Sequence, residues 1–219
     1  MRRFALAAVA AVALVAPVLA QAPAPAAQAP AAQAPAQPAL GPNTWTVDTA
    51  HSAAGFSVKH LLVSTVRGTL GPIKGTIDYD GKSLETLKAD ITIDVTGINT
   101  GTEGRDKDLK SPNFFDVAQF PTATFKSKRA VADGAGKFKL TGDLTMHGVT
   151  KEITLNVEGP SAPLKQGQNL RVGALATATI NRRDWGLQYS RMVEATPMVS
   201  DEVQLTIDLE AVKRPPAGL

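Results

Sequence analysis

The chain has 219 residues, 23 of them basic and 20 acidic, with 43% hydrophobic and 5% aromatic side chains. This length allows one domain or two small ones. The numbers of basic and acidic residues are nearly equal, which excludes the strongly basic surface expected of a nucleic-acid-binding protein. Cysteine is absent, which excludes disulfides, thiolate metal ligands, a cysteine nucleophile and a lipid-modified N-terminal cysteine.

Residues 1–20 have the composition of a secretory signal peptide. Two arginines, Arg2 and Arg3, precede an Ala-rich apolar stretch, which Pro17 interrupts before small residues at a cleavage site near Ala20. The stretch is short for a transmembrane anchor. We therefore predict that the protein is exported and that residues 1–20 are removed.

Residues 21–43 consist almost entirely of Ala, Pro and Gln and carry no charge. Such a segment cannot bury enough apolar surface to offset the entropy of ordering it, so it is predicted to be a disordered linker. A short disordered tail is predicted at residues 214–219. The folded domain is expected between them, at residues 44–213.

Within 44–213, apolar and polar residues alternate with the period of two that is typical of half-buried strands. Ile153, Leu155 and Val157, for example, alternate with Thr154 and Asn156. The same alternation recurs at 91–95, 138–146 and 203–209. Turn signals separate the runs at Asp80-Gly81, Asp133-Gly134, His147-Gly148 and Gly167.

These signals predict an all-β fold whose strands are joined mostly by hairpins. Closure into a barrel would remove exposed strand edges, whereas a two-sheet sandwich is the alternative. One short helix is expected at about 102–110, ended by Ser111-Pro112 because proline restricts the residue before it.

One predicted strand has unusually small residues on its apolar face: Val172, Ala174, Ala176, Ala178 and Ile180. If that face points inward, it leaves volume unfilled. A closed barrel of about eight strands is just wide enough to be packed solid or to hold one elongated ligand. The small side chains favour a cavity.

The segment 105–125 concentrates charge and aromatic residues. It contains Phe114, Phe115, Phe120 and Phe125, four of the seven phenylalanines of the chain. We predict that this aromatic part lines or closes one end of the cavity. The charged turn at 105–110 is predicted to attach to the rim of the barrel.

Two histidines near the start of the domain are candidate polar groups. Phe56, Val58 and His60 share one strand face, so His60 is predicted to point inward, as a ligand's polar anchor, a general base or a structural residue. His51 precedes that strand. With three histidines and no cysteine, a metal site is not expected. No Gly-x-Ser-x-Gly motif is present, and no catalytic residue is predicted.

Two further charged groups neighbour aromatic residues: Arg105 with Asp106, and the segment 181–185, which includes Arg182 and Trp185. One interpretation is a structural ion pair that fixes a loop to the barrel rim. The other places an arginine at the mouth of a pocket, where it contacts a polar head group.

Together these motifs resemble the YceI-like family of periplasmic, lipocalin-like proteins associated with polyisoprenoid binding. The resemblance rests on an ordered set of segments: WTVDTAHS at 45–52, Phe56 with His60, STVRG at 64–68, RDKDLKSPNFFDV at 105–117, FPTATFKS at 120–127, GDLTMHGVTK at 142–151, INRRDWG at 180–186 and VSDEV at 199–203. It implies a closed, eight-stranded antiparallel barrel around an elongated apolar tunnel. It also implies a polyisoprenoid, an isoprenoid quinone or a similar long-chain amphiphile as ligand, with no other cofactor, no metal and no catalytic residue.

The sequence therefore predicts a periplasmic lipid carrier, a monomer or homodimer that contacts a membrane or membrane protein transiently. Two alternatives stay open: a lipid-modifying enzyme that uses His51 or His60 as general base, and a structural or interaction module tethered through 21–43. The candidate tunnel-lining residues are Phe56, Val58, His60, Phe114, Phe115, Phe120, Phe125, Ala176, Ala178 and Ile180. The candidate residues at the mouth, near a head group, are His51, Arg105, Asp106, Arg182 and Trp185.

Overall fold

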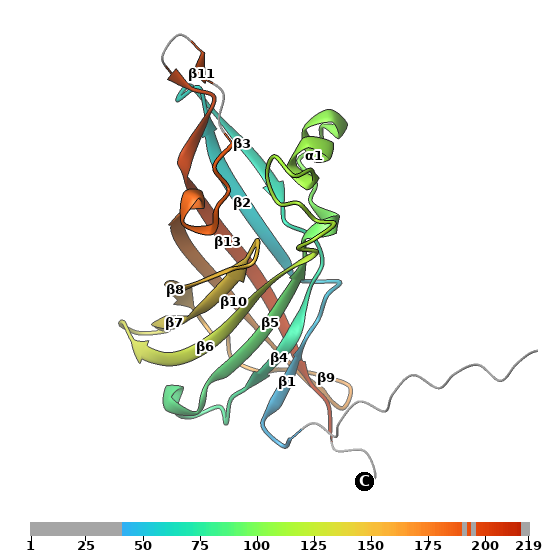
Figure 1. Ribbon diagram of the computed structural model, residues 1–219. Coiled ribbons are helices and arrows are strands. Elements are labelled where there is room, and N and C mark those ends of the chain that lie inside the picture. Colours follow the sequence, from blue (N-terminus) through green and yellow to red (C-terminus); the bar gives the residue numbers. More distant parts are fainter. Residues whose placement is uncertain (1–40, 190–191, 194–195, 216–219) are drawn as a thin grey trace, which may run out of the picture. The chain divides into compact units, whose positions relative to one another are not determined.

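The computed structural model describes residues 41–189, 192–193 and 196–215 (Figure 1). The predicted signal peptide, the linker up to residue 40 and the tail from residue 216 lie outside the described residues. The strands are β1 Thr44–Val47, β2 Ala53–His60, β3 Ser64–Thr69, β4 Ile73–Asp78, β5 Lys88–Asp94, β6 Thr122–Ala132, β7 Lys137–Met146, β8 Val149–Glu158, β9 Leu164–Gln166, β10 Asn169–Asn181, β11 Met192–Val193, β12 Thr196–Pro197 and β13 Val199–Lys213. The helices are α1 Glu103–Lys110 and the 3-10 turns η1 Leu84–Thr86, η2 Val95–Gly97 and η3 Arg182–Trp185.

Eight antiparallel strands close into a barrel in the order β1-β4-β5-β6-β7-β8-β10-β13. The ring closes where β13 returns to β1, with Thr46 opposite Val212. The longest ladder joins β10 to β13, from Leu170 opposite Lys213 to Asn181 opposite Glu202. The predicted barrel is confirmed, and the sandwich alternative is wrong, because this seam leaves one continuous sheet.

The β2–β3 hairpin extends the barrel wall at one end. β13 pairs with β1 only near its C-terminal end, and with β2 from Asp208 opposite Ala53 to Val199 opposite His60. β3 covers the other edge of β2 and reaches the segment after β5 through a bridge from Thr69 to Asn99. One end of the cavity is therefore walled by this hairpin.

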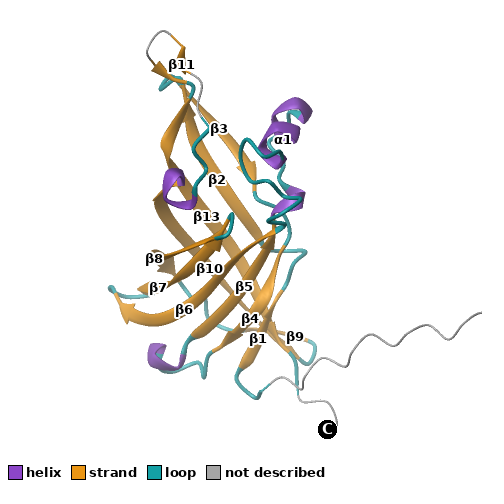
Figure 2. Cartoon of the chain, in the orientation of Figure 1, coloured by secondary structure: helices purple, strands orange, loops and turns teal. Residues whose placement is uncertain are grey.

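The turns have the backbone that their sequences predict. In the β7–β8 turn both central residues are left-handed, His147 with φ 51° and Gly148 with φ 74°, as a tight hairpin requires. The predicted helix is present as α1, and Ser111 caps its C-terminus. Figure 2 shows that the barrel wall is strand and that the helical turns lie at its ends and edges. Every helix in the described part of the chain is too short or too polar to serve as a membrane span.

The alternating strands turn their apolar faces inward. Phe138, Leu140 and Leu144 of β7 are buried, as are Leu155 and Val157 of β8. These side chains surround an internal space rather than filling it completely. That space is the candidate site.

Candidate functional site: an elongated tunnel

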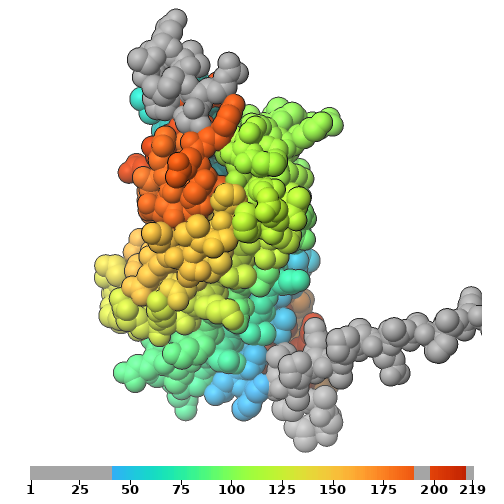
Figure 3. Space-filling model, viewed as in Figure 1, coloured from blue at the N-terminus to red at the C-terminus, as the bar shows by residue number. Residues whose placement is uncertain are grey.

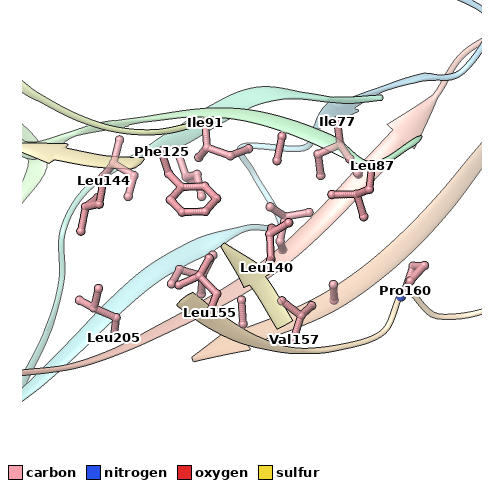
Figure 4. Close-up of a pocket in the computed structure, with 18 of the residues that line it drawn as sticks. Ile77, Leu87, Ile91, Phe125, Leu140, Leu144, Leu155, Val157, Pro160 and Leu205 are labelled. Carbon is pink, nitrogen blue, oxygen red and sulfur yellow. The ribbon is translucent and has the colours of Figure 1, made fainter. Parts of the chain in front are cut away.

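The inner part of the tunnel is an apolar chamber of about 150 Å³ inside the closed barrel (Figure 4). We call it the inner chamber. Of the described residues that line it, none is charged. Those labelled in Figure 4 are Ile77, Leu87, Ile91, Phe125, Leu140, Leu144, Leu155, Val157, Pro160 and Leu205. Such a lining favours an apolar chain over any polar ligand.

The outer part, the mouth chamber, has a volume of about 400 Å³ and lies between the β2–β3 hairpin, α1 and the segment after η3. Its inner side is apolar, with Phe56, Val58, Phe115, Ile180 and Val203 among its residues. Among the described residues, the polar side chains that line it are His60, Ser64, Arg105, Asp108, Arg182 and Tyr189. The two ends of the tunnel therefore differ in polarity.

Three residues, Leu70, Met146 and Leu205, line both chambers. These three side chains therefore form a shared boundary, and the two chambers adjoin as successive parts of one elongated site. Its combined size is in the range of small-molecule sites, which are about 300–1,000 Å³.

The small side chains of β10 leave part of the barrel interior unfilled. Val172, Ala174 and Ala176 line the inner chamber, and Ile180 lines the mouth chamber. Ala178 is buried and is not among the residues that line either chamber. Ala178 lies opposite Leu205 of β13, so the two side chains share one face of the sheet. The larger Leu205 side chain is the one at the boundary of the two chambers.

The four phenylalanines predicted to line or close one end of the tunnel lie in three different places. Phe114 and Phe115 line the mouth chamber, and Phe125 lines the inner chamber. Phe120 lines neither: its ring packs edge to face on His147, with ring centroids 4.8 Å apart, and covers Gly148. It packs on the β7–β8 turn, because the tight turn that begins at Asp116, where φ is 44°, takes the chain there.

Arg182 is 5% exposed and lines the mouth chamber. Its guanidinium donates to the carbonyls of Ser200 (3.0 Å), Tyr189 (3.0 Å) and Leu187, and to the Asp201 carboxylate (3.0 Å). Burial lowers the pKa of Arg182. The arginine thus fastens the segment 187–189 to β13, which is the structural interpretation of this residue.

Arg105 and Asp106 do not pair with each other but with Thr100. Arg105 Nε lies 2.7 Å from Thr100 Oγ1, and Asp106 accepts a hydrogen bond of 2.8 Å from the Thr100 backbone. Both bonds tie α1 to the loop before it. Arg105 lines the mouth chamber, whereas Asp106 does not, because consecutive helical residues point in different directions.

Trp185 is not at the mouth. It is 2% exposed, and its indole nitrogen donates to the Leu144 carbonyl at 3.1 Å. The η3 turn breaks the strand period after Asn181 and rotates Trp185 into the core of the barrel wall. The prediction failed because it treated 181–185 as a loop at the rim.

His51 also lies away from the tunnel. Its side chain is 62% exposed and stands 3.0 Å from Asp48, in a cluster with Arg171 and Glu210 at the seam of β1, β10 and β13. Arg171 Nη1 lies 2.7 Å from Asp48 and also bonds Glu210. The bond from Arg171, followed by that from His51, lowers the pKa of Asp48 to about 2. Asp48, His51 and Glu210 could offer metal ligands, but Arg171 already supplies a positive charge between the two carboxylates.

Several lining residues were not predicted as site residues. Trp45, Tyr79 and Pro160 line the inner chamber, and Tyr189 and Met198 line the mouth chamber. The inward parity of Ile153, Leu155 and Val157 was a usable signal for the inner chamber. Trp45, Tyr79, Pro160, Tyr189 and Met198 lie at strand ends or in loops, where alternation does not predict which way a side chain points.

Comparison with known proteins agrees with this geometry. A YceI-like domain matches residues 45–211. A UPF0312 protein of Staphylococcus aureus is 38% identical over 152 residues, 68% of this chain and 85% of the relative. A UPF0312 protein of Vibrio parahaemolyticus is 31% identical over 172 residues, 78% of this chain and 87% of the relative.

Solved structures share the barrel. The YCEI protein of Campylobacter jejuni is 31% identical, with a TM-score of 0.62 over 72% of this chain and 90% of that one. BcnA of Burkholderia cenocepacia, at 23% identity, has a TM-score of 0.64 over 75% and 98% of the two chains. A domain of Saccharophagus degradans described as polyisoprenoid binding, at 20% identity, has a TM-score of 0.58 over 78% and 98%. At these last two identities the likeness concerns the fold.

Proposed function

The chain belongs to the YceI-like family, and from this premise we propose that it is a periplasmic carrier of a long isoprenoid chain or a similar long-chain amphiphile. It sequesters the chain in its tunnel without changing it chemically. The polyisoprenoid-binding description of the Saccharophagus degradans domain, which has the same fold, supports this ligand class.

The observation that carries the proposal is the inner chamber, whose described lining is uncharged and which adjoins the mouth chamber at Leu70, Met146 and Leu205. Burial of a hydrocarbon chain contributes roughly 0.8 kcal/mol per CH₂. A prenyl or quinone tail therefore binds there with few polar contacts, and no chemistry needs to be encoded in side chains.

The asymmetry of the tunnel orients the ligand. Among the described residues, the charged side chains that line it, Arg105, Asp108 and Arg182, all belong to the mouth chamber. Leaving a polar head group in the inner chamber would cost its desolvation without compensating hydrogen bonds. The tail accordingly enters first and the head group stays beside α1 and the β2–β3 hairpin.

The geometry is less favourable to an enzyme. His51 lies on the outer surface, away from any bound lipid. His60 faces the mouth chamber, but among the described residues it has no hydrogen-bond partner that would orient its ring as a base. The tunnel therefore favours a carrier that returns its ligand unchanged.

Native mass spectrometry of the protein after mild extraction tests the proposal. A co-purifying apolar ligand of constant mass, recovered unchanged after long incubation, is expected. Preparations that never carry such a ligand and do not take up added polyprenol or quinone would contradict the carrier function. A ligand that is converted during incubation would favour the enzyme.

A further inference from the structure

The turn of the β2–β3 hairpin is apolar, exposed and in an unfavourable backbone conformation. We call residues Leu61, Leu62 and Val63 the hairpin tip. Leu62 is 64% exposed and Val63 86%. Leu61 and Leu62 have φ of 50° and 61°, the left-handed region in which tight hairpins favour Asn and Gly. Neither packing nor turn geometry explains why large apolar residues occupy positions 62 and 63.

The hairpin tip stands at the entrance of the tunnel. His60 and Ser64, the residues on either side of it, both line the mouth chamber. The Leu61 amide donates to the carbonyl of Met198, another mouth-chamber residue, at 3.0 Å. In Figure 1 the ends of β2 and β3 lie at the same end of the barrel as α1 and β11, opposite the C-terminal end of β13.

Basic side chains flank the hairpin tip on the outer face of the hairpin. Lys59 lies opposite Thr65, and Arg67 opposite Ser57, so Lys59 and Arg67 share the face opposite to Phe56, Val58 and His60. Both are exposed. The apolar hairpin tip and the basic side chains of Lys59 and Arg67 are complementary to an anionic bilayer, whose acyl region lies beneath a negatively charged layer.

We propose that the hairpin tip inserts into an anionic phospholipid bilayer and docks the tunnel mouth on the membrane. This rests on the proposed carrier function, because docking lets the apolar chain pass between bilayer and tunnel without crossing water. A second copy of the chain is a poorer match: a stable protein interface buries about 800 Å² on each partner, whereas this tip consists of three residues. A bilayer requires only that the side chains reach below the head groups.

Co-sedimentation of the full chain with vesicles that contain phosphatidylglycerol and phosphatidylethanolamine but no isoprenoid tests docking. The variant Leu62→Gly/Val63→Ser removes the apolar tip and suits the left-handed turn, so it is expected to fold and to lose vesicle binding at least tenfold. Val131→Ser/Leu164→Ser removes two other exposed apolar side chains and is expected to bind as the parent does. Lys59→Gln/Arg67→Gln is expected to weaken binding to these vesicles.

Uptake of a polyprenol added in solution separates this proposal from the carrier function. The tip variant is expected to keep that uptake while losing vesicle binding. Unchanged vesicle binding by the tip variant would overturn the docking proposal and leave the carrier function intact. A dimer of the parent that the tip variant abolishes, with no vesicle binding by either, would instead assign the tip to a second copy and also overturn it.

Discussion

Phe114 and Tyr189 meet edge to face at the tunnel mouth, with ring centroids 5.2 Å apart and ring planes at 66°. Phe114 follows α1, and Tyr189 follows η3, so the contact joins two segments that are 75 residues apart. Both rings line the mouth chamber. Figure 3 shows these two segments, green and orange, side by side at one end of the barrel. This is the position from which an aromatic pair can retain a bound chain.

Tyr189→Ala is expected to speed ligand dissociation. An aromatic pair contributes about 0.5–1.5 kcal/mol, which corresponds to an acceleration of up to about tenfold. Because the side chain is partly exposed, the unfolding temperature should change little. Stopped-flow release of a fluorescent prenyl analogue measures the rate. Tyr189→Phe keeps the ring and is the control; equal dissociation rates in all three proteins would show that the pair does not retain the ligand.

Ala176→Phe is expected to obstruct the inner chamber. Ala176 faces that chamber, where a phenyl ring would occupy space the ligand needs, and we expect a loss of polyprenol affinity of at least tenfold. Its neighbour Leu175 is exposed on the other face of β10, so Leu175→Phe is the matched control. Titration of both variants with polyprenol, followed by native mass spectrometry, gives the comparison. Full affinity in Ala176→Phe would place the ligand elsewhere.

The sequence predicted the barrel well because alternation is a repeated signal. Ile153, Leu155 and Val157 reported one strand face, and the glycine turns reported where strands ended. Predictions failed where the chain leaves the strand period: η3 turned Trp185 into the core, and the turn at Asp116 took Phe120 to the β7–β8 hairpin. The cluster of Asp48, Arg171 and Glu210 was missed because barrel closure, not sequence proximity, brings those side chains together.

Phe115→Ala is expected to destabilise the fold and to widen the mouth chamber. Phe115 is buried, and removal of a buried phenylalanine side chain costs about 3–5 kcal/mol. Denaturant unfolding of the ligand-free protein measures this loss. Phe115→Leu, which retains most of the apolar volume, should lose less. An unchanged midpoint in Phe115→Ala would mean that the ring contributes little packing.

Asp48 should make the stability of the fold decrease at low pH. Its pKa is about 2 in the fold and 3.8 ordinarily, so its contribution is complete above pH 4 and is lost as pH falls from about 4 to about 2. Asp48→Asn should flatten the fall in unfolding temperature over that interval, since the amide does not titrate there. Asp133→Asn removes a surface carboxylate that pairs with Lys139 and serves as control. Parallel acid profiles for Asp48→Asn and the parent would contradict the assignment.

Arg182→Lys is expected to loosen the tunnel mouth despite the retained charge. Arg182 donates to three backbone carbonyls and to Asp201 from one planar group, and an ammonium with three donors cannot reach all four acceptors. We expect a loss of about 1–3 kcal/mol for the buried carbonyls left unpaired. Faster amide exchange should appear in 187–189, together with the faster ligand release predicted for Tyr189→Ala.

Arg183 provides the matched control, since its Nε bonds the same Asp201 carboxylate at 2.7 Å from an exposed position. Arg183→Lys alters that surface ion pair without touching the carbonyls of Leu187 and Tyr189, so exchange in 187–189 should stay at the level of the parent. If both lysine variants speed amide exchange in 187–189 to the same extent, the ion pair with Asp201 is what orders the mouth. If only Arg182→Lys loosens 187–189, the bonds to the carbonyls hold Tyr189 against Phe114.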